Sequence, residues 1–172
     1  MNFIPNPLPP VLDATCGSRS IWFDKAHPFA LYVDRRREHH EGVFGKTSPA
    51  ERTLDIEPDV IADFTALPFP DESFWHVVWD PPHLLDASPS QWYFKAYGTL
   101  RSSDWREVIG GGWRECWRVL KPGGTLVFKW ADVSISTPEV LSAIPAAPLY
   151  GHRSGKKSGT HWMIFFKPPK GN

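Results

Sequence analysis

The feature that most constrains the fold is a series of short apolar runs separated by segments of helical or loop character. Several runs are apolar almost throughout, which is typical of strands that are covered on both faces in a parallel sheet. Alternation of such strands with other segments indicates an α/β domain. The expected strands are residues 11–14, 30–33, 60–62, 74–79, 125–130, a weak one near 149–150, and 162–167.

The clearest helix is expected from Asp104 to Leu120, where apolar residues recur at three- and four-residue steps. Ser103 or Asp104 can cap its start, and the Lys-Pro-Gly-Gly sequence at 121–124 ends it. We therefore predict one domain over residues 1–172, with a seven-stranded, mainly parallel sheet, a terminal antiparallel hairpin and helices on both faces. Segments 35–57 and 84–103 lack a clean period and are interpreted as long loops.

Composition limits the partners and the compartment. The 172 residues are 41% hydrophobic, which suffices for one core, and Lys plus Arg equals Asp plus Glu at 19 each. Net charge therefore gives no sign of a polyanionic partner, and nucleic-acid binding must rest on local clusters. Two distant cysteines indicate neither a disulfide framework nor a zinc site. We expect a cytoplasmic protein without a signal peptide, a membrane span or a metal.

Three acidic residues, Asp13, Asp34 and Asp63, end three successive expected strands. Asp34 follows Gly17 at roughly the spacing at which a carboxylate meets ribose hydroxyls in a βαβ unit. Gly17 permits a positive φ and a close approach of the backbone to a ligand. Each acid alone would more often cap or solvate a strand end, but together they indicate a nucleotide site.

The strand at 74–79 runs into Asp80-Pro81-Pro82-His83. Ligands of open α/β sheets bind outside the carboxyl ends of strands, so this turn lies where chemistry is expected. Its prolines fix φ, and Asp80 and the Pro81 carbonyl supply two hydrogen-bond acceptors. An isolated Asp-Pro-Pro would be read as a strand-ending turn; after an apolar strand it is a candidate catalytic motif.

These motifs resemble the class I S-adenosylmethionine-dependent methyltransferases. The resemblance rests on VLDATCGS, YVD, ADFTALPFPDESFWHVVWD and RECWRVLKPGGTLVF, and it covers nearly the whole chain. It implies a Rossmann-like fold and S-adenosyl-L-methionine as cofactor. The usual second glycine of the first motif is Arg19 here. The implied cofactor-binding residues are Asp13, Thr15, Gly17, Ser18, Asp34, Asp63, Phe64 and Asp80.

The DPPH turn resembles the Asp- or Asn-Pro-Pro-aromatic motif of amino-methyltransferases, in which the aromatic residue stacks on an extruded base. This implies that Asp80 and Pro81 bind an exocyclic amino group, adenine N6 before cytosine N4. His83 departs from the aromatic consensus. The tract 151–166, with DPPH and FKW, resembles small methyltransferases of phages and prophages, which favours DNA as substrate. The expected catalytic residues are Asp80, Pro81, Pro82, His83 and Lys129.

Two clusters are candidates for the substrate face. The first interleaves rings with cations, as single-strand and flipped-base binders do, and includes Trp92, Tyr93, Lys95 and Arg101. The second is a basic, glycine-containing hairpin suited to phosphate contact, with Arg153, Lys156, Lys157 and His161. Packing of the rings onto the domain and solvated surface charge are the respective alternatives.

Lys129 interrupts the apolar strand at 125–130 and is costly to bury without a partner, for which Asp80 is the candidate. An Asp–Lys pair resembles the catalytic set of RNA ribose 2′-hydroxyl methyltransferases, although the family's earlier lysine and late glutamate are missing. RNA methylation is thus the second hypothesis, and a catalytically silent binding subunit is the third. No target-recognition domain is evident, so a homodimer or a recognition partner remains open.

Overall fold

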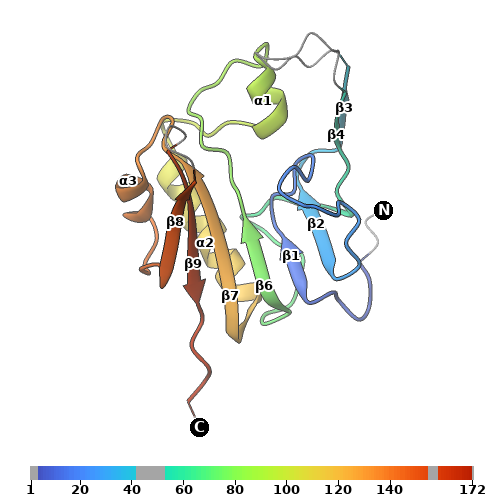
Figure 1. The fold of residues 1–172 in the computed structure, drawn as a ribbon, viewed down its shortest axis with the longest axis vertical. Helices are drawn as coiled ribbons and strands as arrows, with labels where there is room; N and C mark the ends of the chain where they lie inside the picture. The colour runs from blue at the N-terminus through green and yellow to red at the C-terminus, as the bar shows by residue number, and fades with distance from the viewer. Residues whose placement is uncertain (1–3, 42–52, 155–158, 172) are drawn as a thin grey trace.

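The computed structural model describes residues 4–41, 53–154 and 159–171. A seven-stranded sheet has the order β5-β2-β1-β6-β7-β9-β8 (Figure 1). Its strands, in chain order, are β1 (Val11–Asp13), β2 (Ala30–Asp34), β5 (Val60–Ile61), β6 (Phe74–Trp79), β7 (Leu120–Ala131), β8 (Tyr150–Ser154) and β9 (Thr160–Phe166). Strands β5, β2, β1, β6 and β7 pair in parallel, and β9 pairs antiparallel with both β7 and β8. The predicted mainly parallel sheet with a terminal antiparallel hairpin is confirmed.

Helix α2 (Trp105–Val119) covers one face of the sheet and matches the expected helix within a residue at each end. Its buried side chains, including Ile109 and Cys116, meet Leu12, Val77 and Leu126 from the central strands in one hydrophobic cluster. Strand β7 follows the helix directly at Leu120, because its register with β6 already begins there. This direct connection fixes β7 against β6, the strand that Asp80 follows.

Gly112 of α2 packs closely against the rings of Phe64 and Trp79. A Cβ at this position would fall 2.5 Å from a ring carbon of Phe64 and 2.7 Å from one of Trp79, whereas at the neighbouring Gly111 the nearest contact would be 3.6 Å. Gly112→Ala should therefore lower the free energy of unfolding by roughly 1–3 kcal/mol through overpacking. Gly111→Ala, the matched control, should raise it by about 0.5–1 kcal/mol because alanine favours the helix. Urea unfolding of both variants tests this, and equal stabilities would contradict the packing argument.

The second face of the sheet is covered differently from the prediction. In the described parts of the chain, α2 and the short α3 (Thr137–Leu141) both contribute to the first cluster, and no helix covers the opposite face. Over β1 and β2 that face is closed by the irregular segment 14–29, in which Cys16 and Trp22 pack with Ala30 and Tyr32. Between β1 and β2 the chain forms turns and bends, with no helix.

The two segments interpreted as long loops contain regular elements. β3 (Glu38–His40) and β4 (Leu54–Ile56) form an antiparallel pair, and α1 (Trp92–Tyr97) lies within residues 84–103 (Figure 1). A bridge joins Leu85 and Leu100 on either side of α1. These elements are three to six residues long, too short for a hydrophobic period to be read. Among the described helices, none is long and apolar enough to cross a membrane.

Candidate active site

A cleft opens at the carboxyl ends of β1, β2 and β6, with α1 as its opposite wall. Nine residues expected from the sequence line it together: Thr15, Gly17, Ser18, Asp34, Phe64, Asp80, Pro81, Pro82 and His83. The structure adds Arg36 and, from α1 and its end, Ala96, Tyr97 and Gly98. The turn after β1 is held to the turn after β6 because the Asp80 N–H donates to the Thr15 hydroxyl at 2.7 Å.

Asp13 does not lie in the cleft, contrary to the expectation of a cofactor contact. Its side chain is buried, and its oxygens accept hydrogen bonds from the Trp22 indole N–H at 2.7 Å and from the Thr15 N–H at 3.1 Å. Burial raises the pKa of Asp13 from 3.8 to about 7. The residue fixes the turn that carries Thr15 and Gly17, so its role is to position cleft residues.

The raised pKa of Asp13 predicts a pH-dependent stability. The folded state holds the proton more tightly than the unfolded chain, so this contribution is fully present below about pH 4 and is lost as the pH rises through about 7. The stability of the wild type relative to Asp13→Asn, which cannot titrate, should fall by on the order of 4 kcal/mol over that interval. Denaturant unfolding at several pH values measures the difference, and a constant difference would contradict it.

Arg19, at the place of the second glycine of the resemblance, keeps a glycine-like backbone with φ of 55°. Its guanidinium faces away from the cleft, donates to the carbonyls of Lys25 and Glu57 and to Asp59, and stacks over the Tyr32 ring at 3.8 Å. A left-handed conformation costs a non-glycine residue about 1–2 kcal/mol, which these contacts offset. The substitution therefore preserves the turn and adds no cation to the cleft.

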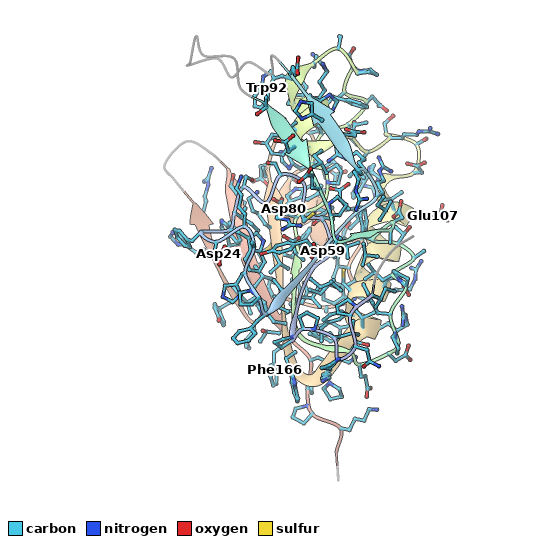
Figure 2. All side chains as sticks on the ribbon, turned by 90° about the vertical axis from the view of Figure 1, so that its right-hand side faces the viewer. Asp24, Asp59, Asp80, Trp92, Glu107 and Phe166 are labelled. Atoms are coloured by element: carbon cyan, nitrogen blue, oxygen red, sulfur yellow. The ribbon has the colours of Figure 1, made fainter. Side chains whose placement is uncertain are left out.

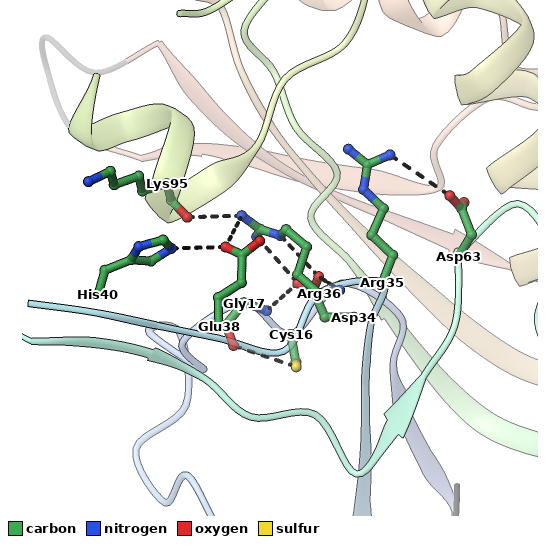
Figure 3. A network of polar contacts seen from close by, with 9 residues as sticks. All are labelled: Cys16, Gly17, Asp34, Arg35, Arg36, Glu38, His40, Asp63 and Lys95. Atoms are coloured by element: carbon green, nitrogen blue, oxygen red, sulfur yellow. Dashed lines mark hydrogen bonds and ion pairs between the residues drawn. The ribbon is translucent and has the colours of Figure 1, made fainter. Parts of the chain in front are cut away.

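Asp34 is the centre of a polar network around the cleft (Figure 3). One carboxylate oxygen accepts from the Gly17 N–H at 3.1 Å, and the other accepts from the Arg36 backbone N–H at 2.9 Å and its Nε at 3.2 Å. The same guanidinium donates to the Lys95 carbonyl of α1 at 2.9 Å. Arg36 thus joins the end of β2 to α1. The sequence does not predict this contact, because a run of three arginines gives no sign of which one turns inward.

The neighbouring residues Asp63 and Phe64 have different surroundings in the structure. Phe64 lines the cleft, whereas Asp63 is not among its lining residues and accepts from the Thr65 N–H and hydroxyl. Its other oxygen lies 3.9 Å from the exposed Arg35. The expectation that Asp63 binds the cofactor stays a prediction, and its hydrogen bonds to Thr65 also stabilise the turn after β5.

Asp80, which follows β6, and Lys129, near the carboxyl end of β7, form an ion pair. The Lys129 ammonium donates to Oδ2 of Asp80 at 2.5 Å, because the parallel register of Trp79 with Phe128 brings the two next positions side by side. Burial raises the pKa of Asp80, and the charge and hydrogen bond of Lys129 oppose that rise. Lys129 also lies over the Trp162 ring at 5.7 Å. Within the described residues no hydrogen bond reaches Oδ1, which is left for a ligand.

His83 lies between the cleft and the aromatic residues around it. Its ring is 5.8 Å from that of Tyr97 and 6.3 Å from that of Trp130. Burial lowers the pKa of His83, although the nearby Asp80 carboxylate opposes this. At neutral pH the imidazole is therefore uncharged, and it presents a ring face or a single N–H to a ligand.

The predicted substrate residues fall in two separate places. Trp92, Tyr93 and Lys95 belong to α1, a helix rather than the expected loop, and Arg101 is exposed just after it. Figure 2 shows Trp92 above Asp80 at one end of the molecule. On the terminal hairpin Arg153 is exposed, and His161 contacts Asp132 at 3.1 Å. Lys156 and Lys157 lie outside the described residues.

Comparison with known proteins finds similar folds but no similar sequence family. No protein-family model matches the chain, and no curated protein matches it. The PH0226 protein from Pyrococcus horikoshii superposes with a TM-score of 0.55 at 14% identity, over 91% of this chain and 81% of that chain. The strand order with β9 antiparallel decides the architecture. The fold is that of the class I methyltransferases.

Two further structural neighbours share parts of this methyltransferase fold. A presumed DNA modification methylase from Thermus thermophilus, solved with S-adenosyl-L-methionine, has a TM-score of 0.39 at 20% identity, over 61% of this chain and 52% of that chain. A presumed S-adenosyl-L-methionine-dependent methyltransferase from Methanococcus maripaludis has a TM-score of 0.36 at 14% identity, over 65% and 55%. The fold alone does not determine the reaction, so function must be argued from the cleft.

Proposed function

We propose that the protein transfers a methyl group from S-adenosyl-L-methionine to an exocyclic amino group of a nucleic-acid base, adenine N6 in DNA above others. The observation that carries this proposal is that the DPPH turn and the Gly17–Asp34 pair line one cleft. Asp34, which has the position of a ribose-binding carboxylate, and the two acceptors Asp80 and the Pro81 carbonyl therefore belong to one cleft.

The residues of the cleft fit the cofactor chemically. Asp34 already accepts four hydrogen bonds, one from the Gly17 N–H and three from Arg36, and these fill the about four acceptor positions of a carboxylate. A ribose hydroxyl that binds Asp34 therefore takes the place of part of the Arg36 guanidinium. Gly17 has φ of 49°, and its missing Cβ keeps the turn open opposite the Ala96 carbonyl of α1. Phe64 offers a ring to the adenine. When bound, the cofactor supplies an electrophilic methyl group on a sulfonium.

Asp80 and Pro81 supply what an amino group needs in order to react. The lone pair of an exocyclic nitrogen is delocalised into the base, and acceptors that bind its protons favour a pyramidal nitrogen and stabilise the positive charge that develops on attack. The nitrogen forms its bond to the methyl carbon as the carbon–sulfur bond breaks with its electron pair going to sulfur. One amino proton then leaves to solvent. Oδ1 of Asp80 and the Pro81 carbonyl are the proposed acceptors.

The Asp80–Lys129 ion pair favours one second candidate, methylation of a ribose 2′-hydroxyl in RNA. Such a pair supports this reaction because the lysine, as a neutral amine, would accept the proton of the hydroxyl. On the leading proposal Lys129 has a different task, which is to keep Asp80 ionised. The proposed partner is therefore a nucleic acid, with DNA ahead of RNA.

Tritium transfer from labelled S-adenosyl-L-methionine to polymer tests the proposal. The wild type should label DNA above RNA, and Asp34→Ala should need more cofactor to reach the same rate. Absence of label in every polymer, with the protein folded and S-adenosyl-L-methionine in millimolar excess, would overturn it.

A further inference from the structure

Helix α1 has an unusual combination of composition and burial. Four of its six residues are aromatic, yet none of the six is buried. Trp92 is 37% exposed and Tyr97 is 41% exposed. Aromatic side chains at this density usually pack into a core, because each one buries a large apolar area. These rings do not, so core packing does not account for them.

The exposed rings continue as a row into the cleft. The Trp92 and Tyr97 rings are 6.1 Å apart, those of Tyr97 and His83 are 5.8 Å apart, and those of His83 and Trp130 are 6.3 Å apart. These separations lie in the range of contacting aromatic pairs. The row begins on the outer surface at Trp92, passes Tyr97 and His83, which line the cleft together with Asp80, and ends at the fully buried Trp130. Figure 2 shows Asp80 below Trp92.

Two contacts hold α1 at this place. The Arg36 guanidinium, itself fixed by Asp34, donates to the Lys95 carbonyl (Figure 3). At the end of the helix Gly98 has φ of 73°, and a Cβ there would lie 3.3 Å from Pro82 of the DPPH turn. The position of the row relative to the catalytic turn is therefore set by the same residues that form the cleft.

The charges beside the row suit a polyanion. Lys95 lies in the last turn of α1, no acidic residue lies in its first turn, and the exposed Arg101 follows shortly after. Stacked rings flanked by cations bind single-stranded nucleic acid, since every base has a π-face and the cations meet the phosphates. A duplex keeps its bases paired and stacked, so it cannot offer these faces without unpairing.

We propose that α1 is a stacking shelf for single-stranded nucleic acid, on which Trp92 and Tyr97 hold the nucleotide next to the one in the cleft. The inference rests on the proposed function, because that function places the target nucleotide in the cleft. It adds that the nucleic acid is bound as a single strand.

Fluorescence anisotropy with labelled oligothymidylate tests the shelf apart from the chemistry, because thymine has no exocyclic amino group to methylate. We expect oligothymidylate to bind at least tenfold more tightly than the matching duplex, and Trp92→Ala to weaken that binding about tenfold, the scale of one lost base–aromatic stack. Trp92→Phe should restore most of it. Trp75→Ala is the matched control, since Trp75 is 53% exposed but lies at the opposite end of β6.

Equal affinity for single strand and duplex, or unchanged affinity of Trp92→Ala with an unchanged melting temperature, would overturn the shelf. An oligouridylate arm distinguishes RNA from DNA as the source of the strand. Tight binding without methyl transfer to any polymer would leave the shelf standing and reject the proposed reaction. Methylation of duplex DNA by Trp92→Ala at the wild-type rate would support the proposed reaction and reject the shelf.

Discussion

Asp80→Ala is expected to lower the turnover number by about two orders of magnitude or more, the scale of losing one preorganised transition-state contact. Affinity for S-adenosyl-L-methionine should change little, because Asp34, Gly17 and Phe64 remain in the cleft. The loss belongs to the transition state because Oδ1 meets the amino group most strongly as positive charge develops on its nitrogen.

Asp80→Asn is the matched control. Its amide oxygen still accepts a hydrogen bond, so it should retain part of the activity that the alanine variant loses. Steady-state kinetics together with calorimetry of cofactor binding separate the two effects. If Asp80→Ala turned over at the wild-type rate, the turn after β6 would have no part in the chemistry.

Lys129→Met is expected to lower activity partially near neutral pH and to recover it as the pH rises. Burial already raises the pKa of Asp80 and Lys129 opposes that rise, so removal of the ammonium leaves burial less opposed. The pKa of Asp80 then rises further, and its carboxylate is present only at higher pH. The acid limb of the pH–rate profile should move to higher pH by a measurable interval.

The same variant separates the two candidate reactions. If Lys129 is the general base for a ribose hydroxyl, its loss should abolish activity at every pH, because methionine cannot accept a proton. If Lys129 only keeps Asp80 ionised, activity returns in alkaline buffer. A profile of near-zero activity from pH 6 to pH 10 would therefore favour the ribose reaction.

The central strands could be predicted because their sequence signal is local. The run FWHVVW is typical of a strand covered on both faces. The Lys-Pro-Gly-Gly sequence correctly predicted where α2 ends, although residues 121–124 belong to β7 and do not form a separate turn. Residues at strand ends follow from topology, since parallel strands bring their carboxyl ends to one edge. For this reason Thr15, Gly17, Asp34 and Asp80 were expected together and line one cleft.

Residues whose role depends on side-chain direction could not be predicted. Asp13 and Asp34 both end apolar strands, yet Asp13 points into the packing of Trp22 and Asp34 points to the cleft. Arg36 differs from its two arginine neighbours in its contact with the Lys95 carbonyl, a residue far along the chain, and the local sequence does not show this contact. Helix α1 was missed because six residues give less than two turns, so no period distinguishes it from a loop.

The most direct measurement is nucleoside mass spectrometry after incubation of the protein with S-adenosyl-L-methionine and single-stranded DNA or RNA. The account predicts N6-methyladenine, formed in DNA above RNA, by the wild type and not by Asp80→Ala. A methyl group on the sugar oxygen, or no methylated nucleoside from a folded protein, would contradict it.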